Sequence, residues 1–162
     1  AVIPALDAYR EAHGTEYWSD LLREEEHQGK RLVGSTGRVT WLVAFAPMGI
    51  FDVIGVPSGV RVPTDIDDGV LTDIAEGVVR VLRFIDSLNM HSLNMSLYFH
   101  AGDSPFTPHL RICPRANIPP FDTSQINYMG MLHGETLTIL RPEDICEGLR
   151  GMWGGPGRGP GG

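Results

Sequence analysis

Apolar residues recur along this chain at two spacings, and each spacing predicts a different kind of element. A helical period of three to four residues runs through residues 64–88, carried by Ile66, Val70, Leu71, Ile74, Val78, Val81, Leu82, Ile85 and Leu88. Asp65, Asp67 and Asp68 stand at the start of this segment, where the helix dipole favours negative charge. We therefore expect one long helix with a single apolar face that packs on a sheet.

Two shorter segments also carry helical signals. Residues 15–28 place Trp18, Leu21, Leu22 and Glu25 on successive turns, and Gly29 follows as a suitable C-terminal cap. Pro142 opens the segment 142–153, with acidic residues beside it in the first turn. These patterns predict a helix near each end of the domain.

Strict alternation of apolar residues predicts strands elsewhere. The clearest case is residues 38–47, followed by residues 49–57, which end at a proline. Further strands are expected at 30–35, 94–102 and 108–115, with a turn over residues 34–37 and a short strand at 135–140. The order of helices and strands predicts an α+β fold with a mainly antiparallel sheet.

The strand at 108–115 carries an unusual row of side chains. Because strand side chains alternate between faces, Leu110 and Ile112 should point one way, and His109, Arg111 and Cys113 the other. Pro114 is expected to close the strand. The row is either a reaction centre, the remains of one, or a set of polar residues that fill a sheet surface.

Composition narrows the class of protein. The 162 residues carry a net charge of -7, which gives no basic footprint for nucleic acid. There is no apolar run long enough for a membrane span, and the two cysteines have no metal-type spacing. We expect one domain over residues 1–153, a flexible Gly/Pro tail over 154–162, and a cytoplasmic location.

Four segments of the sequence, in order, carry a family resemblance over residues 17–152. They are "LLREEEHQGKRLV", "TWLVAFAPMGIFDVIGVP", "NMSLYFHAG", and "PHLRICPR" together with "LRPEDICEGLR". This set resembles the C-terminal lobe of galactose-1-phosphate uridylyltransferases, which belong to the histidine-triad superfamily. The resemblance implies a histidine-triad-like fold, in which a long helix packs on an antiparallel sheet of about five strands.

The resemblance also implies roles for the row at 109–113. The family strand reads His-x-His followed by a third polar residue, and the middle His attacks phosphorus. Here His109 takes the first place and Arg111 the middle one, and an arginine is always protonated and cannot be a nucleophile. No catalytic residue is therefore expected in this chain, and whether it is an enzyme stays open. A divalent metal, zinc or iron, would have His100 and His109 as ligands, with Arg111 in place of the third.

Three functional hypotheses remain open. In the first, the chain is a lobe of a nucleotidyltransferase for galactose-type metabolism, and binds a nucleotide sugar or sugar phosphate through His109, Arg111, Arg115 and His100. Its partner is then a missing N-terminal lobe or a second copy in a homodimer. In the second, the chain is an inert stand-alone domain that binds a nucleotide, a phosphate ligand or a protein. In the third, it is a hydrolase that uses His109 as nucleophile. The non-functional interpretation of both histidines is hydrogen-bonded packing on the sheet.

Overall fold

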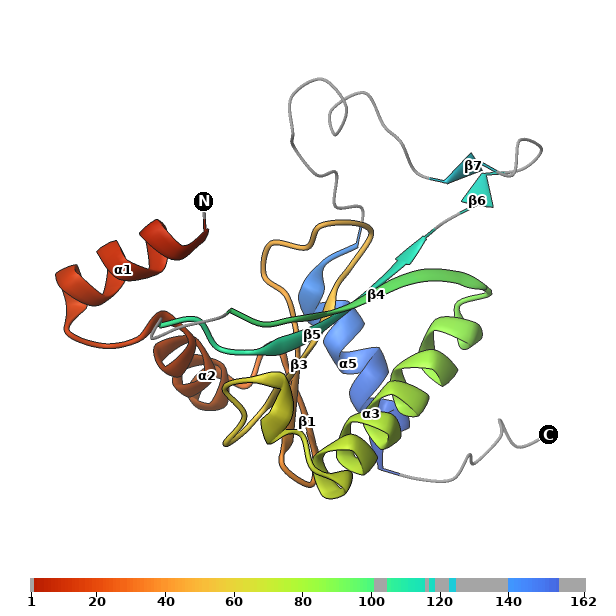
Figure 1. The fold of residues 1–162 in the computed structure, drawn as a ribbon. Coiled ribbons are helices and arrows are strands. Elements are labelled where there is room, and N and C mark those ends of the chain that lie inside the picture. The colour runs from red at the N-terminus through yellow and green to blue at the C-terminus, as the bar shows by residue number, and fades with distance from the viewer. Residues whose placement is uncertain (1, 101–104, 116, 119–122, 125–139, 155–162) are drawn as a thin grey trace.

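The chain folds around one antiparallel sheet, as the computed structural model in Figure 1 shows. The structure describes residues 2–100, 105–115, 117–118, 123–124 and 140–154. The helices are α1 (Val2–His13), α2 (Tyr17–Gln28), the short η1 (Pro63–Asp65), α3 (Asp68–Ser87) and α5 (Pro142–Trp153). The strands are β1 (Leu32–Thr36), β2 (Val39–Val43), β3 (Val53–Pro57), β4 (Ser92–Tyr98), β5 (His109–Arg115), β6 (Asn117–Ile118) and β7 (Thr123–Ser124).

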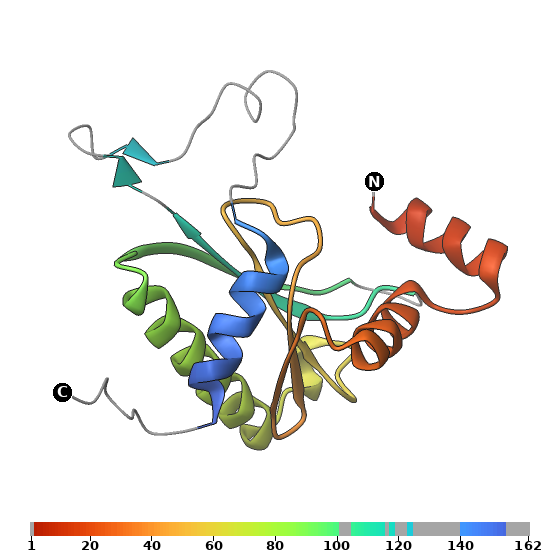
Figure 2. The ribbon, with the colours of Figure 1, turned by 180° about the vertical axis from the view of Figure 1, so that it is seen from behind.

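Five of the strands form the main sheet in the order β1-β2-β3-β5-β4, with every neighbouring pair antiparallel. Helices α3 and α5 lie side by side on one face of this sheet (Figures 1 and 2). The main core fills the space between them and is centred on the fully buried Trp41. A Cβ at Gly77 would lie 2.1 Å from the Trp41 ring, so α3 can approach β2 this closely only with glycine there.

The opposite face of the sheet is covered in part by α2. A second apolar cluster forms there from Trp18 of α2, Leu6 of α1 and the outward-facing residues Leu42, Ile54 and Val56 of β2 and β3. Helix α2 ends at Gly29, which adopts the left-handed conformation that suits a C-terminal cap.

A buried ion pair fastens α2 to the rest of the molecule. Glu25 is 1% exposed and accepts a 2.8 Å hydrogen bond from Arg31, which also donates to Glu143 of α5 at 2.9 Å. The helix face that contains Glu25 is therefore not fully solvated, although its neighbours Glu24 and Glu26 are exposed.

The structure confirms the α+β class, the five-stranded antiparallel sheet and the long helix packed on it. Three details of the sequence prediction were wrong or missing. The strand β5 does not close at Pro114 but continues to Arg115, with Pro114 paired opposite Leu93. The long helix begins at Asp68, capped by the Asp67 side chain, rather than at residue 64. Helix α1 was not predicted.

The continuation through Pro114 has a physical reason. Strand β3 pairs with β5 only as far as Val53, opposite Ile112. Beyond that point β5 keeps one described strand neighbour, β4, and a proline is tolerated where one side of a strand needs no N–H donor. The strand expected at 135–140 and the expected tail at 154–162 fall almost wholly outside the described residues. None of the helices in the described part of the chain is long and apolar enough to cross a membrane.

Candidate ligand-binding site

The row predicted on β5 lies on the α2 side of the sheet, opposite α3 and α5. Leu110 and Ile112 are buried in the main core, while His109 packs on Trp18 of α2 and Arg111 and Cys113 are half-buried. The alternation read from the sequence is therefore confirmed. On the neighbouring strand, Tyr98 lies opposite His109 and Ser96 lies opposite Arg111.

Arg111, which the sequence resemblance assigns to the place of the family nucleophile, is held by a buried carboxylate. Its guanidinium lies 2.9 Å from Asp52 Oδ2, and the Asp52 side chain is 1% exposed. The same oxygen accepts a 2.9 Å hydrogen bond from the backbone N–H of Met48. Because Asp52 neutralises this cation, Arg111 has only part of its donor capacity left for a ligand.

His109 is enclosed by aromatic rings. Its ring centroid lies 4.4 Å from that of Trp18, 5.2 Å from Tyr98 and 5.4 Å from Phe106, and the residue is 6% exposed. Nδ1 lies 2.9 Å from the carbonyl oxygen of Thr107, which can only accept, so the proton sits on Nδ1. Burial is the main reason that the pKa of His109 is lowered, and the imidazole is therefore neutral at pH 7.

Cys113 offers no alternative nucleophile. Burial, with a smaller contribution from the Asp52 carboxylate, raises the pKa of this thiol to about 12. A thiol with so high a pKa holds almost no thiolate at neutral pH, and the thiolate is the reactive form. The sulfur also lies against the backbone of Gly49, where a Cβ would come within 2.4 Å of it.

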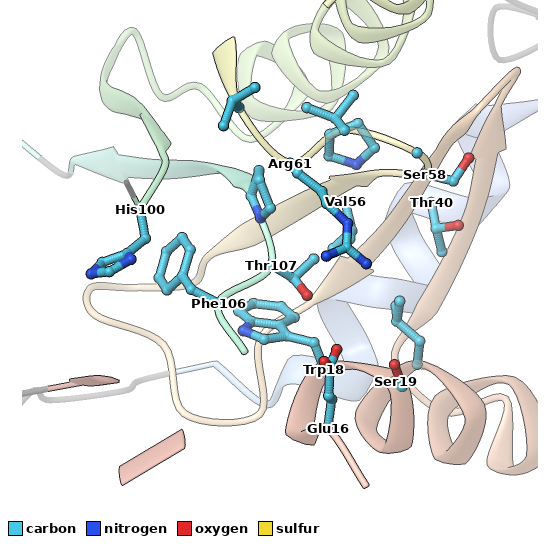
Figure 3. Close-up of a pocket in the computed structure, with 16 residues that line it drawn as sticks. Glu16, Trp18, Ser19, Thr40, Val56, Ser58, Arg61, His100, Phe106 and Thr107 are labelled. Atoms are coloured by element: carbon cyan, nitrogen blue, oxygen red, sulfur yellow. The ribbon is translucent and has the colours of Figure 1, made fainter. Parts of the chain in front are cut away.

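The four residues predicted to bind a ligand are spread along the molecule. His109 and Arg115 lie at opposite ends of β5, which places their backbones roughly 20 Å apart at about 3.3 Å per residue. A single phosphate therefore cannot contact both, whereas an extended ligand could span much of the row. His100 lies beside Phe106, with the two ring centroids 6.2 Å apart, and both residues line the pocket in Figure 3.

The two histidines do not form a metal site with the residues around them. Across the described ranges, no group of three or more His, Cys, Asp or Glu side chains gathers in a way that could hold an ion. The Nδ1 atom of His109 is already used by Thr107, and the next residue on the same face is the cationic Arg111. This donor set does not fit zinc or iron, which prefer four ligands and are repelled by a neighbouring cation.

A pocket of about 340 Å³ opens beside the row, on the same side of the sheet (Figure 3). Three segments distant in sequence form its walls: the first turns of α2, the loop Ser58–Val62 that follows β3, and residues 106–108 before β5. Thr40 and Val56 contribute the wall on the sheet side. Trp18 connects the pocket to the row, because it lines the pocket and packs on His109.

Sequence reasoning missed the three residues that define these two regions, Asp52, Trp18 and Arg61. Asp52 interrupts an otherwise apolar run, and a charge inside such a run is a signal for a buried partner. Trp18 was assigned to a helix face but not to a site. Arg61 lies in a loop between two prolines, where no periodic pattern indicates its surroundings.

Comparison with known proteins gives two kinds of relatives. No family model matches the sequence. An uncharacterised protein of Archaeoglobus fulgidus is 31% identical over 147 residues, which are 90% of this chain and 44% of the relative. Among solved structures, a uridylyltransferase matches with a TM-score of 0.73 at 17% identity, over 93% of this chain and 48% of its own. An ADP-glucose phosphorylase from Arabidopsis thaliana with bound ADP-glucose matches with a TM-score of 0.68 at 17% identity, over 90% of this chain and 46% of its own.

The chain thus spans a little under half the length of each of these three proteins. The match covers nearly all of the present chain, including the sheet, the long helix and the final helix. The resemblance read from the four sequence segments is therefore confirmed at the level of the fold. This chain has the histidine-triad-like fold of the uridylyltransferases and their structural relatives.

Proposed function

We propose that this chain is one lobe of a nucleotidyltransferase of the galactose-1-phosphate uridylyltransferase type, and that it binds a nucleotide sugar or sugar phosphate without forming the covalent intermediate itself. The observation that carries the proposal is Arg111. It stands in the middle of the family strand, at the nucleophile position, and is paired with a carboxylate that is 1% exposed. An arginine in a stable ion pair can bind an anion but cannot attack phosphorus.

The rest of the row also supports ligand binding without nucleophilic attack. Arg115 extends the positive charge along β5, and no hydrogen bond or ion pair engages its side chain among the residues with described positions. An extended ligand with two phosphate groups matches a row of cations better than a single phosphate does. The ADP-glucose phosphorylase that shares this fold was solved with ADP-glucose, a ligand of that kind.

The nucleophile would come from a second lobe, in a cytoplasmic protein, because a second copy of this chain would carry the same Arg111. The three relatives are each about twice as long as the present chain, which supports a two-lobed arrangement. The replacement of the nucleophile also favours the second hypothesis, an inert stand-alone binding domain. The two differ in one respect: the first requires a partner that completes the reaction, and the second does not.

The test is calorimetric titration of UDP-glucose and ADP-glucose into the wild-type chain, Arg111→Lys and Arg115→Ala. Arg111→Lys keeps the positive charge beside Asp52 but removes the planar guanidinium and its paired N–H donors. Arg83→Ala, on the exposed face of α3, is the matched control. We expect binding that both row variants weaken and the control does not. Failure of both nucleotide sugars to bind would overturn the proposal.

Intact-mass spectrometry after incubation with each nucleotide sugar completes the test. We expect no nucleotidyl adduct on the isolated chain, because His109 is enclosed by three rings and Cys113 has a raised pKa. An adduct on His109 would instead support the third hypothesis, a hydrolase with a displaced nucleophile.

A further inference from the structure

The pocket beside the row contains a cation, Arg61, whose guanidinium forms no ion pair or hydrogen bond with the described residues. Arg61 extends from the loop after β3 into the pocket, and its guanidinium points toward Thr107 and the start of α2 (Figure 3). No ion pair or hydrogen bond engages this guanidinium among the residues that the structure places. It differs in this from Arg38, Arg80 and Arg111, which each have a carboxylate within 4.0 Å.

The nearest carboxylate in the sequence is occupied elsewhere. Asp65 accepts hydrogen bonds from the backbone N–H groups of Arg61 at 2.8 Å and Val62 at 3.0 Å. These two bonds, with that from Val62 the stronger influence, lower the pKa of Asp65, and the charge of Arg61 adds a smaller contribution. Asp65 therefore fixes the loop backbone and interacts with the Arg61 guanidinium through charge alone, without an ion pair or a side-chain hydrogen bond. Gly59 makes the turn before it possible, since its φ of 74° is one that few other residues adopt.

The first turn of α2 adds to the positive character of this pocket. Trp18 and Ser19 line it, so the N-terminal end of a 12-residue helix forms one wall. The first N–H groups of a helix lack intrahelical partners, and the preceding residue, Glu16, makes no side-chain cap. An anion bound by Arg61 would lie near these donors, where the helix dipole also favours negative charge.

The remaining lining is made of hydroxyl groups, apolar side chains, the imidazole of His100 and the carboxylate of Glu16, whose charge opposes that of an anion. The hydroxyls belong to Ser19, Thr40, Ser58 and Thr107. Within the part of the chain that the structure describes, none of the four donates or accepts a side-chain hydrogen bond. They stand around a cavity of about 340 Å³, at the small end of the range for small-molecule sites. Hydroxyl donors and acceptors of this kind suit a ligand with several hydroxyl groups, and Phe106 offers an apolar wall for its carbon skeleton.

We propose that the Arg61 pocket is a second binding site, for a small polyhydroxylated anion: a monosaccharide that carries one phosphate or one carboxylate. Arg61 binds the anionic group in its planar fork, and the hydroxyl side chains bind the sugar. The site is separate from the cations of the β5 row and does not need them. The two sites differ in place, although His100 lines the pocket and Trp18 connects it to the row.

The test is calorimetric titration of glucose 1-phosphate and of glucuronate. The first sugar carries a phosphate and the second a carboxylate, so the pair shows which anionic group the site binds. Uncharged glucose and inorganic phosphate serve as controls, because glucose lacks the anionic group and phosphate lacks the sugar. We expect binding of at least one sugar anion, tighter than that of glucose or of phosphate. Arg61→Ala should weaken it at least tenfold, as for a lost hydrogen bond to a charged group. Arg83→Ala, at an exposed arginine outside the pocket, should leave it unchanged.

Two further variants keep the result interpretable. Thr107→Val removes one hydroxyl but keeps the side-chain shape and the backbone carbonyl that His109 uses, and it should weaken binding several-fold. The loss caused by Arg61→Ala should be of the same size in an Arg111→Lys background, because the two arginines belong to different sites. If sugar-anion binding survives Arg61→Ala, or if neither anion binds the wild type, this inference is wrong. If binding survives Arg61→Ala but is lost in Arg111→Lys, the ligand belongs to the β5 row. If neither anion binds but UDP-glucose or ADP-glucose does, the proposed function stands without this second site.

Discussion

Two arginines, Arg111 and Arg61, lie on the same side of one sheet and differ in what surrounds them. Arg111 lies on a central strand, half-buried, with its charge satisfied by the buried Asp52. Arg61 lies on a loop, exposed, with no partner in the described structure, and points into a pocket lined by hydroxyl groups. The Arg111 cation is neutralised within the fold and keeps only part of its donor capacity for a ligand, whereas Arg61 has no carboxylate within ion-pair distance among the described residues.

The comparison teaches that the family position of a residue does not by itself indicate its present role. The sequence resemblance assigns Arg111 to the place from which the family strand acts, yet much of its hydrogen-bonding capacity is used within the protein. Arg61 matches no motif, yet a guanidinium without a carboxylate partner has more to gain from a bound anion. Each prediction below changes one side of this comparison.

The largest expected effect follows from removal of Asp52. Asp52→Ala leaves the Arg111 cation unpaired and removes the acceptor of the Met48 N–H. We expect the free energy of unfolding to fall by about 3 kcal/mol, the range for breaking a buried ion pair. Urea denaturation measures it, with the exposed Asp86→Ala as control. Equal stability of the two variants would show that Arg111 does not depend on Asp52.

The next effect concerns the thiol beside this ion pair. Because burial and Asp52 raise the pKa of Cys113 to about 12, alkylation by iodoacetamide at pH 8 should be about a hundredfold slower than for a free cysteine peptide. Peptide mapping by mass spectrometry separates Cys113 from the buried Cys146. Labelling of Cys113 at the rate of the peptide would mean that the β5 row is far more open than this structure indicates.

A smaller effect should appear in the pH dependence of stability. The pKa of His109 is lowered in the folded state, so the unfolded chain binds the proton more readily. Stability should therefore be complete above the unfolded value of about 6.5 and decrease as the pH falls below it, by about 1.4 kcal/mol for each pKa unit of difference. Melting temperatures between pH 5 and 8 measure this slope. The slope should be shallower in His109→Gln, and an identical slope would contradict the assignment.

The smallest effect is expected at Arg61. Because its guanidinium has no partner among the described residues, Arg61→Ala should change the free energy of unfolding by no more than about 0.5 kcal/mol. The same denaturation experiment as for Asp52→Ala measures it. A loss of several kcal/mol would mean that Arg61 supports the fold, and that its pocket is a consequence of packing rather than a ligand site.

The elements of this fold were largely predictable from periodicity. Alternation over residues 109–115 correctly assigned the two faces of β5, and the helical period gave α3 and α5. Helix α1 was not predictable in this way, because Leu6 is its one buried residue and no apolar stripe marks it. The end of β5 was misjudged because a neighbouring strand, and not Pro114, decides how far the strand continues.

The site was predictable only in part, because its decisive contacts join distant segments. The row His109, Arg111 and Cys113 can be read from the sequence, but the partner of Arg111 lies 59 residues earlier, at Asp52, immediately before β3. Likewise, no local pattern brings the loop of Arg61 next to α2 and to residues 106–108. Whether an arginine is satisfied or free is a property of tertiary structure.

The most direct test of this account is an NMR titration that follows the Nε–Hε resonances of the arginine side chains as glucose 1-phosphate or glucuronate is added. Assignment by the Arg61→Ala and Arg111→Lys variants identifies the two signals of interest. The account predicts that the Arg61 resonance shifts in a saturable way with at least one of the two anions, while that of Arg111 stays in place because Asp52 holds it. A saturable shift of Arg111 with Arg61 unmoved would contradict it, and would return the sugar anion to the β5 row.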